Sequence, residues 1–455
     1  MNQLPSPSFI DSQLHIFERN NKWIGYGIEC GMVLTLTEAE ALALKWYARG
    51  EPMSVIARDL SVSESFCEDI IHSVRDRIGK KKVYHRPFED VSSLLLLVAE
   101  GCNMACTYCY GQYHRNDVSE KIMDEKTAIK ALDVGYAAGA RGVGFFGGEP
   151  LINFDVIEKV VGHAEKNGMD ITWGITTNGT LVTEGIAKFC QDHDIAVSVG
   201  MDGMRHEHEK TRPLKTGRNS FDKVVGGVEL LRDHGVLKAL EFTYSANHKS
   251  DLRDMLKSMT KYCSNVTCTC VDGRRDAPFQ EEIIAGDRLR EYYREMIDLA
   301  LDSDIAEEGL YLGGVVEAVW SLLMPVKVTN PCICSGVLKR ASVTTNGDIY
   351  PCPEAVDEKY LLGNVWDPDI VERLNGRRKH VLETQLSASR VQPYWFSGLI
   401  EACLVRFEER GGRMVIDDPD TIGTCMEDVI YALTEADVDS LIDKWEATGR
   451  QGLLT

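Results

Sequence analysis

The sequence lacks any apolar run long enough to cross a bilayer, which takes roughly 18 to 20 residues. Residues 1–21 have neither the basic nor the apolar segment of a secretory signal. Basic residues are also scarce: 50 Lys and Arg stand against 70 Asp and Glu, a formal net charge of −20. Because an electrostatic nucleic-acid binder needs a basic face, we expect a cytoplasmic protein with neither a membrane nor a nucleic-acid partner.

The length and the cysteine content indicate several domains with metal or redox chemistry. A chain of 455 residues is too long for one ordinary core. Fourteen cysteines in a chain without a secretory signal point to metal ligands before disulfides. Local patterns divide the chain into residues 1–87, 88–306 and 307–455.

The first segment combines strand-like and helix-like patterns. Apolar and polar residues alternate in three stretches, which predict strands at residues 14–18, 22–28 and 32–36. Helical patterns follow at residues 41–46, 52–60 and 61–78. Thr37 is the expected cap of the first helix, and Ser61 or Ser63 that of the third. This order predicts a winged-helix-like α+β module.

The second segment alternates apolar strands with helical stretches. The expected strands are residues 94–99, 142–146, 170–176, 195–200 and 239–244. Repeated strand–helix units predict an α/β fold, a partial (β/α)6 TIM-like barrel around a parallel sheet. Catalytic groups should then lie on loops at the carboxyl ends of the strands.

A cysteine triplet follows the first of these strands. Cys102, Cys106 and Cys109 have the spacing C-x3-C-x2-C. Three soft thiolates in one loop can occupy three corners of an iron–sulfur cubane and leave the fourth iron open. The alternatives are three buried structural cysteines or a zinc site, to which His114 could add a fourth ligand.

Residues 98–110, around the triplet, resemble the cluster loop of the radical S-adenosylmethionine (SAM) superfamily. In that family the open iron binds SAM, and reduction of the [4Fe–4S] cluster cleaves SAM to methionine and a 5′-deoxyadenosyl radical, which abstracts hydrogen from the substrate. The resemblance implies that this chain carries such a cluster and uses SAM. It also places Tyr110 near the adenine.

Two further strand ends resemble SAM-binding motifs of this family. Gly147, Gly148 and Glu149 resemble its glycine-glycine-glutamate-proline turn, where Glu149 would receive the SAM ammonium. Asn178 lies in a stretch that resembles the strand end facing the SAM ribose, and an ordinary Asn-Gly turn is the alternative there.

A third strand end departs from the family pattern. Asp202 and Arg212 match the aspartate and arginine of a serine-x-aspartate-glycine and arginine stretch, and Arg212 would pair with the SAM carboxylate. Gly200 occupies the serine position. Ser198, two residues earlier on the same strand face, is the candidate substitute.

The third segment contains further cysteines. An Asn-Gly-Asp turn predicts a hairpin over residues 341–352. The region resembles the SPASM or shorter twitch extension of radical SAM peptide-modifying enzymes, which binds auxiliary [4Fe–4S] clusters. Three cysteine positions of the full pattern are Arg390, Pro393 and Leu399 here, so we expect a C-terminal iron–sulfur extension with one auxiliary cluster.

Its expected ligands are Cys334, Cys352 and Cys403, with Cys332, Cys425 or a substrate thiolate as the fourth. A zinc site or a cluster-free remnant is the alternative. A separate group, Cys263, Cys268 and Cys270, has no motif and is interpreted as structural or as a minor metal site.

The first segment resembles the precursor-recognition element of ribosomal peptide maturases. That element binds a leader peptide as an added strand, here beside residues 32–36. A winged-helix DNA binder is the alternative, but Glu64, Glu68 and Asp69 offset the basic residues of the third helix.

Together the segments resemble ranthipeptide and sactipeptide maturases, which implies an oxidoreductase that forms a thioether in a precursor peptide and takes electrons from a donor such as ferredoxin or flavodoxin. Carbon–carbon crosslinking, epimerisation or decarboxylation of a peptide, maturation of a sulfatase or quinohemoprotein, and a non-catalytic zinc or peptide-binding protein stay open as alternatives.

Overall fold

The computed structural model describes residues 4–28, 30–78, 84–86, 90–112, 121–217, 219–271, 279–284, 286–301, 311–312, 326–328, 339–388 and 419–435. In these residues, no helix is both long and apolar enough for a membrane span.

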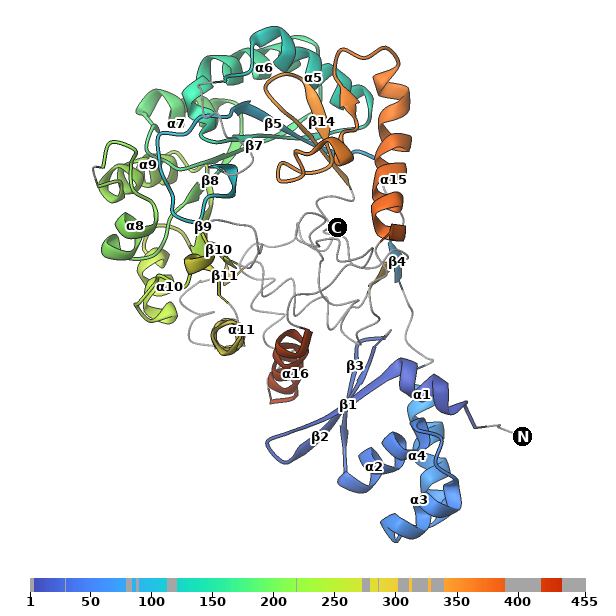
Figure 1. Cartoon of the computed structure of the whole chain (residues 1–455). Helices are drawn as coiled ribbons and strands as arrows, with labels where there is room; N and C mark the ends of the chain where they lie inside the picture. The colour runs from blue at the N-terminus through green and yellow to red at the C-terminus, as the bar shows by residue number, and fades with distance from the viewer. Residues whose placement is uncertain are drawn as a thin grey trace.

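The N-terminal elements form a three-stranded antiparallel sheet with helices on one side (Figure 1). The strands are β1 (Leu14–Arg19), β2 (Lys22–Gly27) and β3 (Met32–Leu36). Asn20 and Asn21 both have positive φ, 49° and 60°, as a tight turn between twisted strands requires. The helices are α1 (Pro7–Gln13), α2 (Glu38–Ala48), α3 (Met53–Leu60) and α4 (Glu64–Ile78). The sequence patterns did not predict α1.

The structure shows which of the two expected serines, Ser61 or Ser63, caps helix α4. Thr37 and Glu40 form a reciprocal capping box at the start of α2. Ser63 accepts a hydrogen bond from Phe66 N at 3.1 Å, so it caps α4. Ser61 instead ends α3 in the left-handed conformation, with φ of 55°.

The middle of the chain forms the parallel part of a ten-stranded sheet, in the order β11-β10-β9-β8-β7-β6-β5-β13-β14-β15. Its strands are β5 (Ser93–Ala99), β6 (Gly142–Gly147), β7 (Thr172–Thr177), β8 (Ile195–Gly200), β9 (Leu237–Tyr244), β10 (Asn265–Cys270) and β11 (Tyr311–Leu312). The first five were predicted to within two residues at each end.

Helices cover the outer side of this curved sheet in Figure 1. They are α5 (Glu125–Ala137), α6 (Phe154–Lys166), α7 (Glu184–Asp192), α8 (Arg205–Thr211), α9 (Phe221–Asp233), α10 (Leu252–Thr260) and α11 (Asp287–Leu301). Short 3-10 helices are at Tyr110–Gln112, Pro150–Asn153, Gln280–Glu282 and Glu358–Tyr360. The predicted fold class, a mixed α/β partial barrel, is confirmed.

The C-terminal hairpin continues the barrel sheet beyond β5. Strand β13 (Arg340–Val343) runs parallel to β5 and pairs antiparallel with β14 (Asp348–Tyr350), which pairs with β15 (Gly363–Asn364). The sequence predicted the hairpin but not its place beside β5. Helix α15 (Ile370–Ala388) follows, and a separate parallel pair joins β4 (Tyr84–Arg86) to β12 (Val326–Val328).

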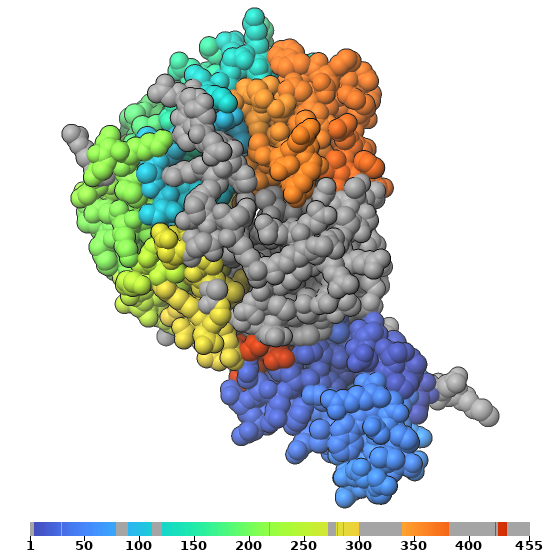
Figure 2. Space-filling view, viewed as in Figure 1, coloured from blue at the N-terminus to red at the C-terminus, as the bar shows by residue number. Residues whose placement is uncertain are grey.

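Helix α16 (Pro419–Glu435) lies between the N-terminal sheet and α11. In Figure 2 its red atoms lie between the yellow atoms of the barrel and the blue atoms of the N-terminal elements. Phe17 and Tyr26 of that sheet share one buried cluster with Val429 and Ile430 of α16. The helix expected at residues 435–448 lies outside the described residues except for Glu435.

Candidate functional site

A cavity of about 610 Å³ opens at the carboxyl ends of the parallel strands. The loop after β5 contributes the three predicted cluster cysteines together with Tyr108 and Tyr110. The strand ends contribute the residues Phe146, Gly147, Gly148, Thr176, Thr177, Asn178, Gly200, Glu241, Thr243 and Thr269. This is the edge at which the sequence placed the catalytic groups.

The loop of the three cysteines is fixed by main-chain hydrogen bonds to the segment around Arg212. Ala105 N donates to Pro213 O at 2.8 Å, and Thr107 N donates to Thr211 O at 2.9 Å. Lys215 N donates back to Asn103 O at 3.0 Å. The predicted sulfur ligands and Arg212 are therefore held as one unit.

Cys102, Cys106 and Cys109 are partly buried free cysteines that line the cavity. Met104 N donates to Cys102 Sγ at 3.4 Å, and Asn178 Nδ2 approaches the same sulfur at 3.6 Å. Burial raises the pKa of Cys102, and it raises the pKa of Cys106 to about 12 against the opposing charge of Arg212. These thiols are protonated at neutral pH unless a bound metal displaces the proton.

Soft sulfur donors at a cavity edge, with N–H groups directed at one of them, fit an iron–sulfur cluster. Among the described residues, no three His, Cys, Asp or Glu side chains converge on one metal-ion position. A cubane binds each thiolate through a different iron, so it does not require such convergence. His114 lies outside the described residues.

Gly147 and Gly148 are required by the close approach of two strand ends. A Cβ at Gly147, where φ is 136°, would collide with Ala99 O, and one at Gly148 would collide with Gly101 O. Gly148 N donates to Ala99 O at 2.8 Å. The glycines thus bring the turn after β6 against the end of β5, beside the cysteine loop.

Glu149 is fully buried and satisfied by its own chain. Its carboxylate accepts hydrogen bonds from Thr177 Oγ1 at 2.7 Å, Asn178 N at 2.7 Å and Leu151 N at 3.0 Å. Burial raises its pKa, opposed by these three donors. In this arrangement Glu149 joins the ends of β6 and β7 and lies behind the cavity wall.

Asn178 joins the end of β7 to the cysteine loop. Its Nδ2 donates to Asn103 Oδ1 at 2.8 Å, and its Oδ1 accepts from Thr180 N at 3.0 Å. Asn178 lines the cavity, so its side chain orders the wall beside Cys102.

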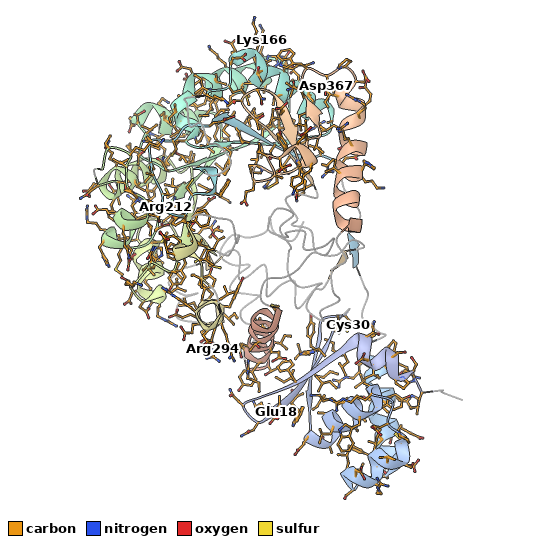
Figure 3. The ribbon with its side chains drawn as sticks, in the orientation of Figure 1. Glu18, Cys30, Lys166, Arg212, Arg294 and Asp367 are labelled. Atoms are coloured by element: carbon orange, nitrogen blue, oxygen red, sulfur yellow. The ribbon has the colours of Figure 1, made fainter. Side chains whose placement is uncertain are left out.

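Asp202 is a buried anchor for Arg212. Arg212 Nε lies 2.9 Å from Asp202 Oδ1, and Asp202 Oδ2 accepts from Thr211 Oγ1 at 2.7 Å and from the hydroxyl of Tyr108. Burial opposes ionisation of Asp202, but the positive charge of Arg212 holds its pKa below the usual value. Arg212, labelled in Figure 3, lines the cavity, and its guanidinium is paired with the Asp202 carboxylate.

The sequence reasoning missed Tyr108. It lies between Cys106 and Cys109 and lines the cavity, and the Arg212 guanidinium lies 5.5 Å from its ring centroid. The available signal was an aromatic residue inside the cysteine motif. Tyr110, which was singled out, also lines the cavity, from the 3-10 helix after the motif.

Gly200 gives Arg212 its space. A Cβ at Gly200 would collide with Arg212 Nη1, so a serine here would displace the guanidinium. Ser198, the candidate substitute, lies earlier on β8, is partly buried and is not among the residues that line the cavity.

Of the C-terminal candidates, Cys352 is partly buried just after β14, where Glu354 N donates to its sulfur at 3.5 Å. Cys332, Cys334 and Cys403 lie outside the described residues. Cys425 lies in α16, but the structure describes only its backbone.

The three cysteines without a motif, two on β10 and one before it, lie in different surroundings. Cys268 is buried beside the Tyr292 hydroxyl, 3.5 Å away, which fits a structural role. Cys270 lines the cavity, and Cys263 packs at the edge of the barrel core.

Comparison with known proteins gives a family model and several relatives. Residues 96–257 match the model of the Radical SAM superfamily. An uncharacterised protein of Methanocaldococcus jannaschii is 35% identical over 153 residues, 32% of this chain and 51% of the relative. The chain therefore spans about half of that relative.

Two sulfatase-maturating enzymes are similar to a larger part of the chain. A cysteine-type anaerobic sulfatase-maturating enzyme of Clostridium perfringens is 25% identical over 311 residues, 64% of this chain and 81% of the relative. A serine-type enzyme of Bacteroides thetaiotaomicron is 26% identical over 309 residues, 61% of this chain and 73% of the relative.

Solved structures give the same fold. The enzyme anSMEcpe with bound AdoMet and the Cp18Cys peptide superposes with a TM-score of 0.63 at 18% identity, over 78% of this chain and 99% of that one. A second anSMEcpe structure with bound AdoMet has a TM-score of 0.64. A radical SAM domain implies a [4Fe–4S] cluster and SAM. From the matched residues and this fold, the chain carries a radical SAM domain and is an enzyme, so the non-catalytic alternative is not favoured.

Proposed function

We propose that this enzyme modifies a ribosomally synthesised precursor peptide in the cytoplasm and forms a thioether between a cysteine sulfur and a carbon of the same peptide. The observation that carries the proposal is the joint placement of Cys102, Cys106 and Cys109 with Arg212 around one cavity at the strand ends. The peptide substrate is proposed from the sequence resemblance of all three segments.

The three cysteines would hold the cluster, and Arg212 would pair with the carboxylate of SAM. When bound, the cluster and SAM would supply the radical that takes one hydrogen atom from the substrate carbon. As the sulfur–carbon bond forms, the cysteine thiol would lose its proton and the remaining electron would pass to the proposed auxiliary cluster. The chain itself keeps Arg212 directed at the cavity through Asp202, and Tyr108 closes the same wall. Glu149 and Asn178 fix the neighbouring strand ends, so the cavity is ordered before a ligand enters.

The segment before residue 88 is proposed to hold the leader of the precursor. Among the described residues β3 pairs only with β2, and its other edge has no described strand partner, which supports an added strand there. The proposed boundaries are residues 1–87 for this module, 88–306 for the radical SAM barrel and 307–455 for the C-terminal extension.

The C-terminal extension is proposed to hold one auxiliary [4Fe–4S] cluster, with Cys352 as a ligand. Cys352 follows β14, and β13 of the same hairpin pairs with β5, the strand that leads into the cysteine loop. Glu354, two residues after Cys352, lines the same cavity as the cysteine loop, which supports an auxiliary cluster near the first one.

The test is anaerobic reconstitution followed by reaction with SAM, a ferredoxin or flavodoxin donor and candidate precursor peptides. About eight irons per chain fit two clusters and about four fit one. Deoxyadenosine formation together with a peptide product lighter by two mass units would support the proposal. A sulfatase-type peptide is the control, because named relatives mature sulfatases. Turnover of that peptide alone would replace the proposal by the protein-maturase alternative, and a complete lack of deoxyadenosine would refute both.

A further inference from the structure

The cavity contains a half-buried carboxylate, that of Glu241, which the proposed function does not use. Glu241 lies on β9, where Leu240 and Phe242 are fully buried on the helix side. Glu241 and Thr243 alternate with them and line the cavity. The carboxylate is thus on the inner face of the barrel, on the same cavity as the cysteine loop.

Within the described part of the chain, no donor reaches the carboxylate of Glu241 and no cation forms an ion pair with it. The main-chain carbonyl of Glu241 accepts from Met201 N at 2.9 Å and from Arg212 Nη2 at 3.5 Å, but these bonds leave the side chain unsatisfied. Burial raises the pKa of Glu241, and the charge of Arg212 only partly opposes this. A carboxylate that is partly withdrawn from water and has no donor is destabilised, so a ligand that supplies donors would recover that free energy.

Two other carboxylates near the cavity already accept hydrogen bonds. Glu149 accepts three hydrogen bonds, and Glu100 accepts one from Thr345 Oγ1 at 2.6 Å. Arg212 lies 2.9 Å from Asp202, so its charge is largely taken up there. Among the described residues, Glu241 therefore differs from these carboxylates, because it lines the cavity without a hydrogen-bond donor.

We propose that Glu241 is the anionic subsite of the cavity and that its carboxylate binds a cationic group of the bound ligand. The cation could come from SAM, through its sulfonium or its ammonium, or from a basic side chain of the substrate. The inference rests on the proposed function, because that function supplies both sources. A charge-assisted hydrogen bond or close ion contact is the chemistry common to both.

The test compares wild-type holoenzyme with Glu241→Gln, which keeps the size of the side chain and removes its charge. Binding of SAM, S-adenosylhomocysteine and methylthioadenosine is measured by anaerobic calorimetry. These ligands share the adenosine part; the second lacks the sulfonium charge and the third also lacks the ammonium. A sulfonium contact predicts that only SAM weakens, by about tenfold, and an ammonium contact predicts that SAM and S-adenosylhomocysteine weaken together.

A substrate source predicts a different pattern. All three nucleosides then bind Glu241→Gln normally, while n-butylammonium and methylguanidinium, probes for lysine and arginine side chains, lose their saturation-transfer NMR signal. If the three nucleosides weaken equally, the contact is to a neutral group, and the proposal is wrong. It is equally wrong if neither the nucleosides nor the two organic cations respond.

Two further variants exclude simpler explanations. Glu229→Gln removes the same charge from the exposed face of α9 and should leave every affinity unchanged. Glu241→Asp keeps the charge and should preserve the preference for the cation, measured as the ratio of affinities for SAM and methylthioadenosine, even if both affinities fall. Wild-type iron content and deoxyadenosine formation report on the proposed function separately. If those fail, the organic cations still test Glu241.

Discussion

Two buried aspartates, one at the barrel cavity and one at the joint of the N-terminal module, are stabilised in different ways. Asp202 is fully buried, and its side-chain partners Tyr108, Thr211 and Arg212, like the Thr243 main chain that also donates to it, belong to the barrel. The side-chain partners come from the cysteine loop and the end of α8, so Asp202 orders one site from within.

Asp428 on α16 instead pairs with arginines from two bodies. Its side chain is 9% exposed and contacts Arg19 of β1 on one side. On the other side Arg290 and Arg294 of α11 lie 3.2 and 3.7 Å away. Arg294 is labelled at this joint in Figure 3. The first carboxylate pre-organises a site, whereas the second connects the module to the barrel.

The largest effect is expected when the pair at the cavity is broken. Asp202→Ala leaves the Arg212 guanidinium buried without its partner, and removal of one member of a buried pair costs about 3 to 5 kcal/mol. Urea unfolding measures the loss, and iron content after reconstitution should fall as the cysteine loop loosens. Asp222→Ala is the control, because it breaks an exposed pair with Arg205 of α8 and should change little. An unchanged unfolding midpoint for Asp202→Ala would remove Asp202 as an anchor.

The barrel region around Asp202 should also show a pH-dependent stability. His208 Nδ1 accepts from Asp202 N at 3.1 Å. Burial lowers the pKa of His208 to about 4, with Asp202 opposing the shift and the positive Arg212 and His248 adding to it. The unfolded chain, with a histidine pKa near 6.5, binds more protons between these values, so stability is complete above pH ~6.5 and decreases as pH falls toward 4.

A shift of this size corresponds to about 3 kcal/mol. The measurement is the difference in urea-unfolding free energy between wild type and His208→Asn from pH 7 to pH 4.5. Asn keeps an acceptor near the position of Nδ1 and does not titrate, so it cancels other acid effects. Parallel pH profiles for the two proteins would contradict the assignment.

An intermediate effect is expected at the joint. Asp428→Asn removes the negative charge that contacts three arginines, which should lower the free energy of unfolding by about 2 kcal/mol. The loss should be smaller than that for Asp202→Ala because these arginines are more exposed than Arg212. We also expect the module and the barrel to unfold in two separate transitions. Glu427→Gln, which can keep a hydrogen bond to His15, should retain a single transition. Two transitions in both variants would show that the charge of Asp428 is not what couples the unfolding of the N-terminal module to that of the barrel.

The features that the sequence predicted correctly depend on short-range patterns. The local apolar patterns predicted the first and last residues of β3 and β8 correctly, and the spacing of three cysteines predicted the loop that lines the cavity. Thr37 with Glu40 predicted a real capping box because both members lie within one turn.

Contacts between distant residues were beyond reach. No local pattern shows that β13 pairs with β5, or that Asp428 meets Arg19. Glu149 was expected to receive a ligand, but its hydrogen bonds from Thr177 and Asn178, at the end of the next strand, were not expected. Tyr108 was overlooked because its partner Asp202 is 94 residues away.

The smallest effect should be confined to the module. Thr37→Ala removes the oxygen that accepts from Glu40 N at 3.3 Å, which costs about 1 kcal/mol. Hydrogen exchange at the first turn of α2 should become about fivefold faster, since 1 kcal/mol changes an opening equilibrium by that factor. Thr37→Ser keeps the oxygen and should exchange as wild type does. Exchange at Thr243 N, which donates to Asp202 at 3.2 Å, should not change in either variant. Faster exchange there in Thr37→Ala would mean that the module and the cavity form one cooperative unit, and the contrast between the two aspartates would then be one of degree only.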